Sequence, residues 1–132
     1  MSQENVEVVQ RAVAALNERD IDGYLACCTE DVQLFPPTAQ IEGAYEGRSG
    51  VRRFLADVQD AGPNFRLSVE RLESIGPDRV LGFLQATMSG RASGIDNDFP
   101  VTNIYDLANG RIRRVRVFMD RDAALEAAGL RE

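Results

Sequence analysis

The chain has 132 residues, of which 44% are hydrophobic and 27% charged, and its net charge is −6. This length fits one domain, residues 1–132, which can bury about two-thirds of its unfolded surface. The acidic balance argues against a nucleic-acid-binding surface, and no apolar run approaches the roughly 18 residues of a membrane span. The stretch MSQENVEVV lacks the basic and apolar regions of a signal peptide, so we expect a cytoplasmic protein.

The N-terminal part predicts two helices. The first is indicated by apolar residues at helical spacing, namely Val6, Val9, Val13 and Leu16. Asp20 is a predicted N-cap of a short second helix. The apolar stripe of this second helix consists of Ile21, Tyr24, Leu25 and Cys28. Cys28 is therefore expected to face the core as a small hydrophobic residue, with Cys27 at its flank.

The cysteine and histidine content of the chain excludes several kinds of chemistry. Cys27 and Cys28 are the only thiols, and neighbouring residues lie too close together for an ordinary disulfide. The chain has no histidine, so it lacks Ser-His and Cys-His nucleophile pairs and an ordinary zinc site. We therefore expect no metal and no cofactor.

A strand and a third helix follow. DVQLFPP, residues 31–37, reads as a short strand that its prolines end. YEGRSGVRRFLADVQ, residues 45–59, predicts a helix with Ser49 as its cap. The stripe of this helix is formed by Val51, Phe54, Leu55 and Val58.

From residue 62 onward the apolar period changes to that of strands. Residues 64–75 alternate but slip phase at Leu72, which suggests a bulge or bend. Residues 79–90 form an almost continuously apolar strand, and 91–98 a polar connection. Residues 99–120 read as a hairpin around Asn-Gly, and a closing helix follows. This order predicts an α+β fold with a strongly bent antiparallel sheet.

Four stretches carry a resemblance to a known family. VVQRAVAALNERDIDGYL, leading into DVQLFPP, is followed by YEGRSGVRRFL and NGRIRRVRVF. Over roughly residues 6–130 the chain resembles the nuclear-transport-factor-2-like superfamily, in particular its SnoaL-like and ketosteroid-isomerase-like branches. The resemblance implies a cone-shaped curved sheet wrapped around a long helix, with a deep pocket. It also implies a homodimer, since many members pair through the outer face of the sheet.

At the positions of the family's catalytic residues, this chain has residues of other types. The isomerase pattern has a tyrosine, a base and a buried acid where this chain has Ala12, Pro36 and Thr102. The carboxylate position of the related epoxide hydrolases and SnoaL-type cyclases corresponds to Val117. The Arg-x-Asp pair of the hydrolases falls near Leu84 and Ala86, or one residue later. The catalytic residues are therefore unknown.

Strand alternation in the isomerase-like register predicts a largely apolar pocket wall. Its predicted members are Leu16, Tyr24, Leu34, Pro36, Phe54, Leu84, Ala86, Met88, Thr102, Ile104, Val115, Val117 and Met119. The wall predicts binding of a small apolar molecule. The same residues could also fill a core that leaves no cavity.

Two other functions stay open. The chain could be an isomerase, cyclase or epoxide-hydrolase-type enzyme with relocated catalytic groups. The candidates for such groups are Tyr24, Tyr45, Asp98, Asn103 and Asp106. It could also be a dimeric accessory module without a ligand. Arg114, Arg116 and Phe118 share the face opposite the predicted wall, which suits a dimer interface or a solvated sheet face.

Overall fold

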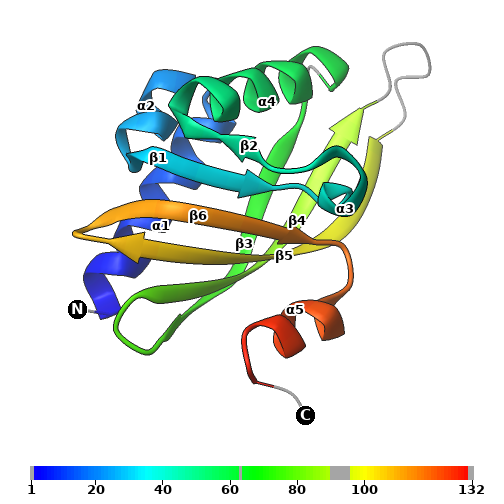
Figure 1. The fold of residues 1–132 in the computed structure, drawn as a ribbon. Helices are drawn as coiled ribbons and strands as arrows, with labels where there is room; N and C mark the ends of the chain where they lie inside the picture. Colours follow the sequence, from blue (N-terminus) through cyan, green and yellow to red (C-terminus); the bar gives the residue numbers. More distant parts are fainter. Residues whose placement is uncertain (1, 63, 90–95, 131–132) are drawn as a thin grey trace.

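The computed structural model describes residues 2–62, 64–89 and 96–130, and it has the predicted α+β organisation (Figure 1). The N-terminal half contains α1 (Ser2–Asn17), α2 (Ile21–Ala26), β1 (Cys28–Phe35), α3 (Ala39–Glu42), β2 (Tyr45–Glu46) and α4 (Gly47–Ala61). The C-terminal half contains β3 (Arg66–Ile75), β4 (Arg79–Ser89), β5 (Asp96–Ala108), β6 (Arg111–Phe118) and α5 (Arg121–Ala127). None of the described helices is both long and apolar enough to cross a membrane.

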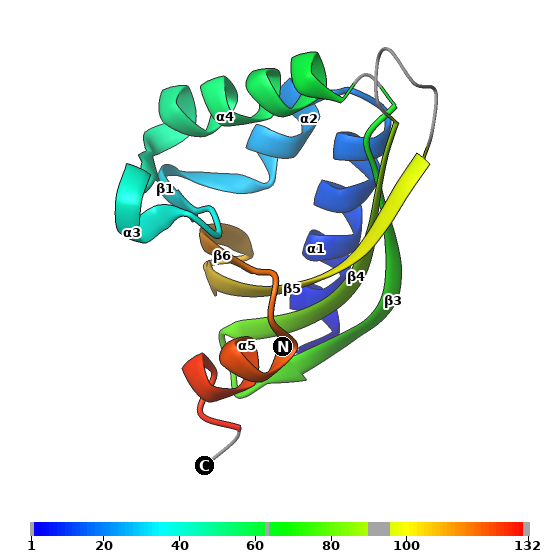
Figure 2. The ribbon, with the colours of Figure 1, turned by 90° about the vertical axis from the view of Figure 1, so that its right-hand side faces the viewer.

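All six strands belong to one curved sheet, in the order β2-β1-β6-β5-β4-β3. β1 is parallel to β6, and the other neighbours are antiparallel. The sheet curves around α1, while α2 and α4 lie across the open side of the curve (Figure 2). This is the cone-shaped arrangement that the resemblance implied.

Two local features of the sheet confirm the pattern of the sequence. The pairing of β3 with β4 shifts between Val69 and Arg71, next to the predicted phase slip. At the β5–β6 turn, Asn109 and Gly110 have φ angles of 53° and 77°. Positive φ at both central residues is the requirement of the two-residue turn that Asn-Gly favours.

The sheet buries a different apolar cluster on each face. The inner cluster joins α1, α2 and α4 to the concave side of the sheet, and it includes Val9, Cys28 and Tyr105. The outer cluster joins Leu81, Phe83 and Ile104 to α5. α5 is thus held on the face opposite α1, which leaves the concave side to the other helices.

Several element boundaries differ from those predicted. α4 begins at Gly47, before the predicted cap Ser49. α2 ends at Ala26, and β1 already begins at Cys28 because Cys28 pairs with Ile112 of β6. The short elements α3 and β2 had no recognisable pattern in the sequence. β5 begins at Asp96, within the predicted connection, and the rest of that connection lies outside the described residues.

Candidate functional site

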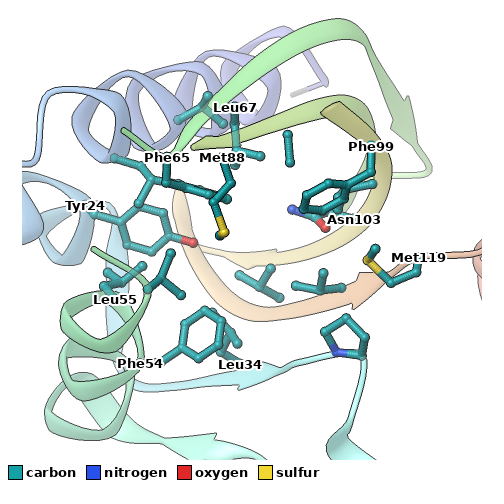
Figure 3. A pocket seen from close by; sticks show the side chains of 18 of the residues that line it. Tyr24, Leu34, Phe54, Leu55, Phe65, Leu67, Met88, Phe99, Asn103 and Met119 are labelled. Atoms are coloured by element: carbon teal, nitrogen blue, oxygen red, sulfur yellow. The ribbon is translucent and has the colours of Figure 1, made fainter. Parts of the chain in front are cut away.

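A cavity of about 210 Å³ lies inside the curve of the sheet. α1, α2, α4 and five of the strands contribute to its wall, and Figure 3 shows most of these side chains. The wall consists of Val13, Leu16, Tyr24, Leu34, Pro37, Phe54, Leu55, Val58, Phe65, Leu67, Ala86, Met88, Phe99, Val101, Asn103, Tyr105, Val115, Val117 and Met119. Apolar side chains dominate because the wall is the part of the inner core that the converging elements leave unfilled.

Nine of the residues predicted from strand and helix periodicity lie in this wall. They are Leu16, Tyr24, Leu34, Phe54, Ala86, Met88, Val115, Val117 and Met119. Along β6 and at the end of β4, the residues that line the cavity are those that the isomerase-like register turns inward. Leu55 and Val58 also belonged to the predicted α4 stripe, and they line the cavity beside Phe54.

The predicted inward face of β5 needs a correction by one residue. Cross-strand partners project to the same face of a sheet. Ala86 pairs with Phe99, and Val117 pairs with Asn103, so the odd-numbered residues of β5 face the cavity. Thr102 and Ile104 lie on the outer face, where Ile104 packs in the outer cluster. The residue of β5 that faces the cavity here is thus Asn103 rather than Thr102.

Two further predicted wall residues also lie elsewhere. Pro36 follows the end of β1 and borders a shallow groove on the outside, while the adjacent Pro37 reaches the cavity. Leu84 faces inward but packs within the inner cluster, with only 1% of its surface exposed. Pro36 lies beyond the end of β1, where strand alternation no longer applies, and the correction for Leu84 depends on packing depth, which alternation does not encode.

Three polar side chains interrupt the apolar wall: Tyr24, Asn103 and Tyr105. Asn103 Nδ2 donates a hydrogen bond of 3.0 Å to Tyr105 Oη. Asn103 Oδ1 is buried and has no partner among the described residues. The hydrogen bonds of the described residues include none from Tyr24 Oη, which points toward the middle of the cavity (Figure 3). The cavity therefore offers unused hydrogen-bonding capacity at two places.

The phenols of this wall stay protonated at ordinary pH. Burial raises the pKa of Tyr105 to about 12, against a smaller lowering by the Asn103 hydrogen bond. Burial also raises the pKa of Tyr24 well above its usual value, and the nearby Tyr105 and Cys28 contribute to the same shift. Both effects follow from the cost of placing an anion among apolar groups. The phenols can donate hydrogen bonds, but they are poor bases.

The other candidate catalytic groups lie away from the cavity. The ring of Tyr45 contacts that of Phe54 in a tilted arrangement with centroids 5.0 Å apart, but the Tyr45 hydroxyl donates to Glu42 at the surface. Asp98 is exposed near the start of β5. Asp106 lies on the outer face with Arg114. Among the described residues that line the cavity there is no Asp, Glu, Lys or Arg.

The thiols take part in packing. Cys28 is fully buried, and its Sγ–H donates to the carbonyl oxygen of Tyr24 at 3.4 Å. Burial raises the pKa of the Cys28 thiol to about 12, so a reactive thiolate is disfavoured. Nowhere in the described parts of the chain do three Cys, His, Asp or Glu side chains gather closely enough to hold a metal ion.

The residues of the predicted interface are partly engaged within the chain. Asp106 lies 2.6 Å from Arg114 Nε and 3.7 Å from Arg116, through the same carboxylate oxygen. Phe118 packs against the outer cluster beneath α5. Asp106 Oδ1 and Arg116 Nε are buried without a partner in the described residues.

The SnoaL-like domain profile matches residues 9–115. The chain belongs to the SnoaL-like family. This SnoaL-like protein thereby has the predicted place in the nuclear-transport-factor-2-like superfamily, and its match covers every strand except the end of β6. No curated protein matches the chain.

Solved structures share the fold of this SnoaL-like protein at low identity. TerC, co-crystallised with polyporic acid, has 24% identity, a TM-score of 0.78, and coverage of 96% of this chain and 98% of its own. A protein from Jannaschia sp. CCS1, classed with the SnoaL-like polyketide cyclases, has 22% identity, a TM-score of 0.78, and coverage of 98% and 93%. Rv0760c from Mycobacterium tuberculosis, in complex with estradiol-17beta-hemisuccinate, has 19% identity, a TM-score of 0.76, and coverage of 90% and 95%.

Proposed function

We propose that this SnoaL-like protein binds a small, largely apolar molecule in the cavity and does so without acid–base catalysis by a carboxylate. The observation that carries the proposal is the composition of the wall, in which three neutral polar side chains are surrounded by apolar ones. Such a surface binds by excluding water from apolar area, and its few polar groups orient the ligand.

The size of the cavity limits the ligand. An engineered cavity of about 150 Å³ in another protein binds benzene, and drug-sized ligands occupy pockets of about 300–1,000 Å³. At about 210 Å³, this cavity suits a substituted single ring or two fused rings. Two proteins of the same fold were crystallised with ring compounds, polyporic acid and an estradiol derivative, which supports a ring-shaped ligand here.

The wall itself provides the test. Met88 and Met119 lie in it, so ¹³C-labelled methionine methyl groups report directly on the cavity. We expect naphthalene to shift both methyl signals saturably and to raise the melting temperature, because a ligand that binds only the folded state stabilises it. Unchanged Met88 and Met119 signals at saturating naphthalene would refute the proposal.

A filled cavity should lose this response. Ala86 is fully buried in the wall, so Ala86→Leu places three additional carbons in the cavity. We expect the variant to remain folded and to bind naphthalene at least tenfold more weakly. Ala127→Leu makes the same substitution at an exposed position of α5 and should bind like the unaltered protein.

The enzymatic alternative has less support. An isomerase, cyclase or epoxide hydrolase needs a group that moves a proton, and of the five candidates only Tyr24 and Asn103 lie in the wall. Both are hydrogen-bond donors that lack basicity. The alternative would therefore depend on catalysis by neutral donors, and turnover that Tyr24→Phe abolishes without loss of binding would favour it.

We also propose that the protein forms a homodimer through the outer face of the sheet. The supporting observation is the pair of partly exposed arginines on this face, Arg114 and Arg116, whose side chains are 33% and 25% exposed. Arginine is enriched at protein interfaces, and its guanidinium group offers several donors to acceptors of a second copy. Binding through this face alone would correspond to the accessory-module alternative.

A further inference from the structure

The carbonyl oxygen of the Asn103 side chain lacks a hydrogen bond although it is buried, and an unpaired buried acceptor costs free energy of folding. Asn103 is only 5% exposed, and its Oδ1 has no partner among the described residues. The other atom of the same amide, Nδ2, is held by Tyr105 Oη at 3.0 Å. In this orientation of the amide, Oδ1 is the atom that lacks a donor.

The cavity is the space that adjoins this side chain. Asn103 and Tyr105 both belong to the cavity wall, and Tyr24 stands on the wall formed by the helices (Figure 3). An unsatisfied buried acceptor is unfavourable enough that native structures rarely leave one without water or a ligand. The amide therefore favours a ligand with a hydrogen-bond donor over one that is wholly apolar.

We infer that the cavity selects neutral ring compounds carrying a hydroxyl group, and that this hydroxyl donates its hydrogen to Asn103 Oδ1. The inference rests on the proposed function, since it specifies the ligand of the same cavity. Asn103 is the residue that determines this specificity. Tyr24 Oη can donate or accept, so it tolerates several substituents and discriminates less.

A neutral hydroxyl fits this wall better than an ionised one. An alkoxide or phenolate has no hydrogen to donate to Asn103 Oδ1, and the lining residues include no Lys or Arg to compensate its charge. The raised pKa values of Tyr24 and Tyr105 have the same cause, since oxygen anions are disfavoured among these apolar groups. A bound phenol should therefore be held in its protonated form.

Three probes of nearly equal shape test the hydrogen bond. 2-Naphthol carries a donor, 2-methylnaphthalene replaces the hydroxyl by a methyl group, and 2-methoxynaphthalene can only accept. Their dissociation constants are measured by the methionine methyl signals in the unaltered protein and in Asn103→Leu. Comparing the same probe between the two proteins removes differences in hydrophobicity among the probes.

We expect Asn103→Leu to weaken the affinity for 2-naphthol by about tenfold, the factor that corresponds to one neutral hydrogen bond. The affinity of 2-methylnaphthalene should stay the same or improve. Thr102→Val, which changes the neighbouring residue on the outer face, should leave all three affinities unchanged. Tyr105→Phe, which frees the amide, should reduce the preference for 2-naphthol and so provides a second test if Asn103→Leu does not fold.

The outcomes separate this inference from the proposed function. If 2-naphthol and 2-methylnaphthalene bind but respond equally to Asn103→Leu, the cavity binds apolar rings and the hydroxyl selection is wrong. If 2-methoxynaphthalene loses as much affinity as 2-naphthol, the amide presents its nitrogen, and the inference is again wrong. If none of the probes, naphthalene included, binds the unaltered protein, the proposed function itself fails.

A separate absorbance measurement tests whether the bound ligand is neutral or ionised. 4-Nitrophenol is partly ionised near neutral pH, and only its phenolate absorbs visible light. We expect the protein to decrease this absorbance, because it takes up the neutral phenol and shifts the equilibrium toward it. An increase in the absorbance would show that the phenolate is preferred and would overturn the selection of a neutral hydroxyl.

Discussion

Cys28, Tyr24 and Tyr105 are three weak acids that the fold buries close to one another. Cys28 contributes to the raised pKa of both tyrosines, and Tyr105 contributes to that of Tyr24, so the three groups lie close together. In the unfolded chain their pKa values return to ordinary ones, 9.0 for the thiol and 10.0 for the phenols. The three groups should therefore dominate the alkaline limit of stability.

The direction of this effect follows from proton binding. Because the folded pKa values are raised, the folded protein keeps protons that the unfolded chain releases, so stability is fully present below pH 9.0 and is lost above it. We expect the free energy of unfolding, measured in urea from pH 7 to 11, to fall above pH 9. Each group should contribute up to about 1.4 kcal/mol per pH unit.

Substitutions can show which residue causes the decline of the unfolding free energy with pH. Cys28→Ala should remove the part of the decline that begins near pH 9, with Cys27→Ala as the matched control for the neighbouring half-buried thiol. Tyr105→Phe should reduce the slope above pH 10. A free energy of unfolding that stays constant to pH 11 would contradict the burial of these groups.

At the scale of elements, the short helix α2 determines the position of Tyr24. Six residues form a marginal helix, so its cap matters. Asp20 Oδ1 accepts a hydrogen bond of 2.9 Å from the backbone nitrogen of Gly23. The sequence predicted this cap, and the structure confirms it.

Asp20→Ala should therefore affect both stability and binding. We expect a loss of about 0.5–2 kcal/mol of unfolding free energy, the usual cost of removing an N-cap. We also expect a measurably weaker affinity for 2-naphthol, because Tyr24 is no longer held in one place. Chemical denaturation and the methionine methyl titration measure the two effects.

α5 supplies a matched control for this prediction. Asp120 caps α5 in the same manner, accepting from the backbone nitrogen of Asp122 at 3.0 Å, and α5 packs on the outer face away from the cavity. Asp120→Ala should lower stability by a similar amount and leave naphthol binding intact. If both variants weaken binding equally, the effect comes from general destabilisation rather than from the position of Tyr24.

At the scale of the whole molecule, the proposed dimer needs a test that spares the fold. Phe118 packs beneath α5, so a charge there would disturb the single chain. Phe35 is the better site, because it is half-buried at the end of β1 beside Arg116, its register partner on β6. A glutamate at this position can pair with Arg116 and should leave the chain folded.

We expect the unaltered protein to sediment as a dimer at micromolar concentration and Phe35→Glu to shift it toward the monomer at unchanged melting temperature. Ile41→Glu serves as the control, since Ile41 is 89% exposed on α3 and lies outside the sheet. A monomer for the unaltered protein, or equal weakening by both variants, would refute the proposed interface.

The α+β class, the order of most elements, the hairpin at Asn109 and Gly110, and the bend in β3 could all be predicted from the sequence. These features depend on local rules: helical and strand periods, helix caps and turn residues act within a few positions of the chain. The resemblance to a known family then supplied the curvature of the sheet. The resemblance also supplied the register in which Val115, Val117 and Met119 face inward, and strand alternation gave their spacing.

Only the tertiary structure decided which face of β5 lines the cavity. Residues 101–107 are all buried, so alternation along this strand carries no signal of inside and outside. The face is set by pairing, because Val117 and Ala86 on the neighbouring strands fix Asn103 and Phe99 on their own side. The one amide that gives the cavity a chemical preference was therefore visible in the sequence only as a candidate, and its role depends on neighbours that the chain brings together when it folds.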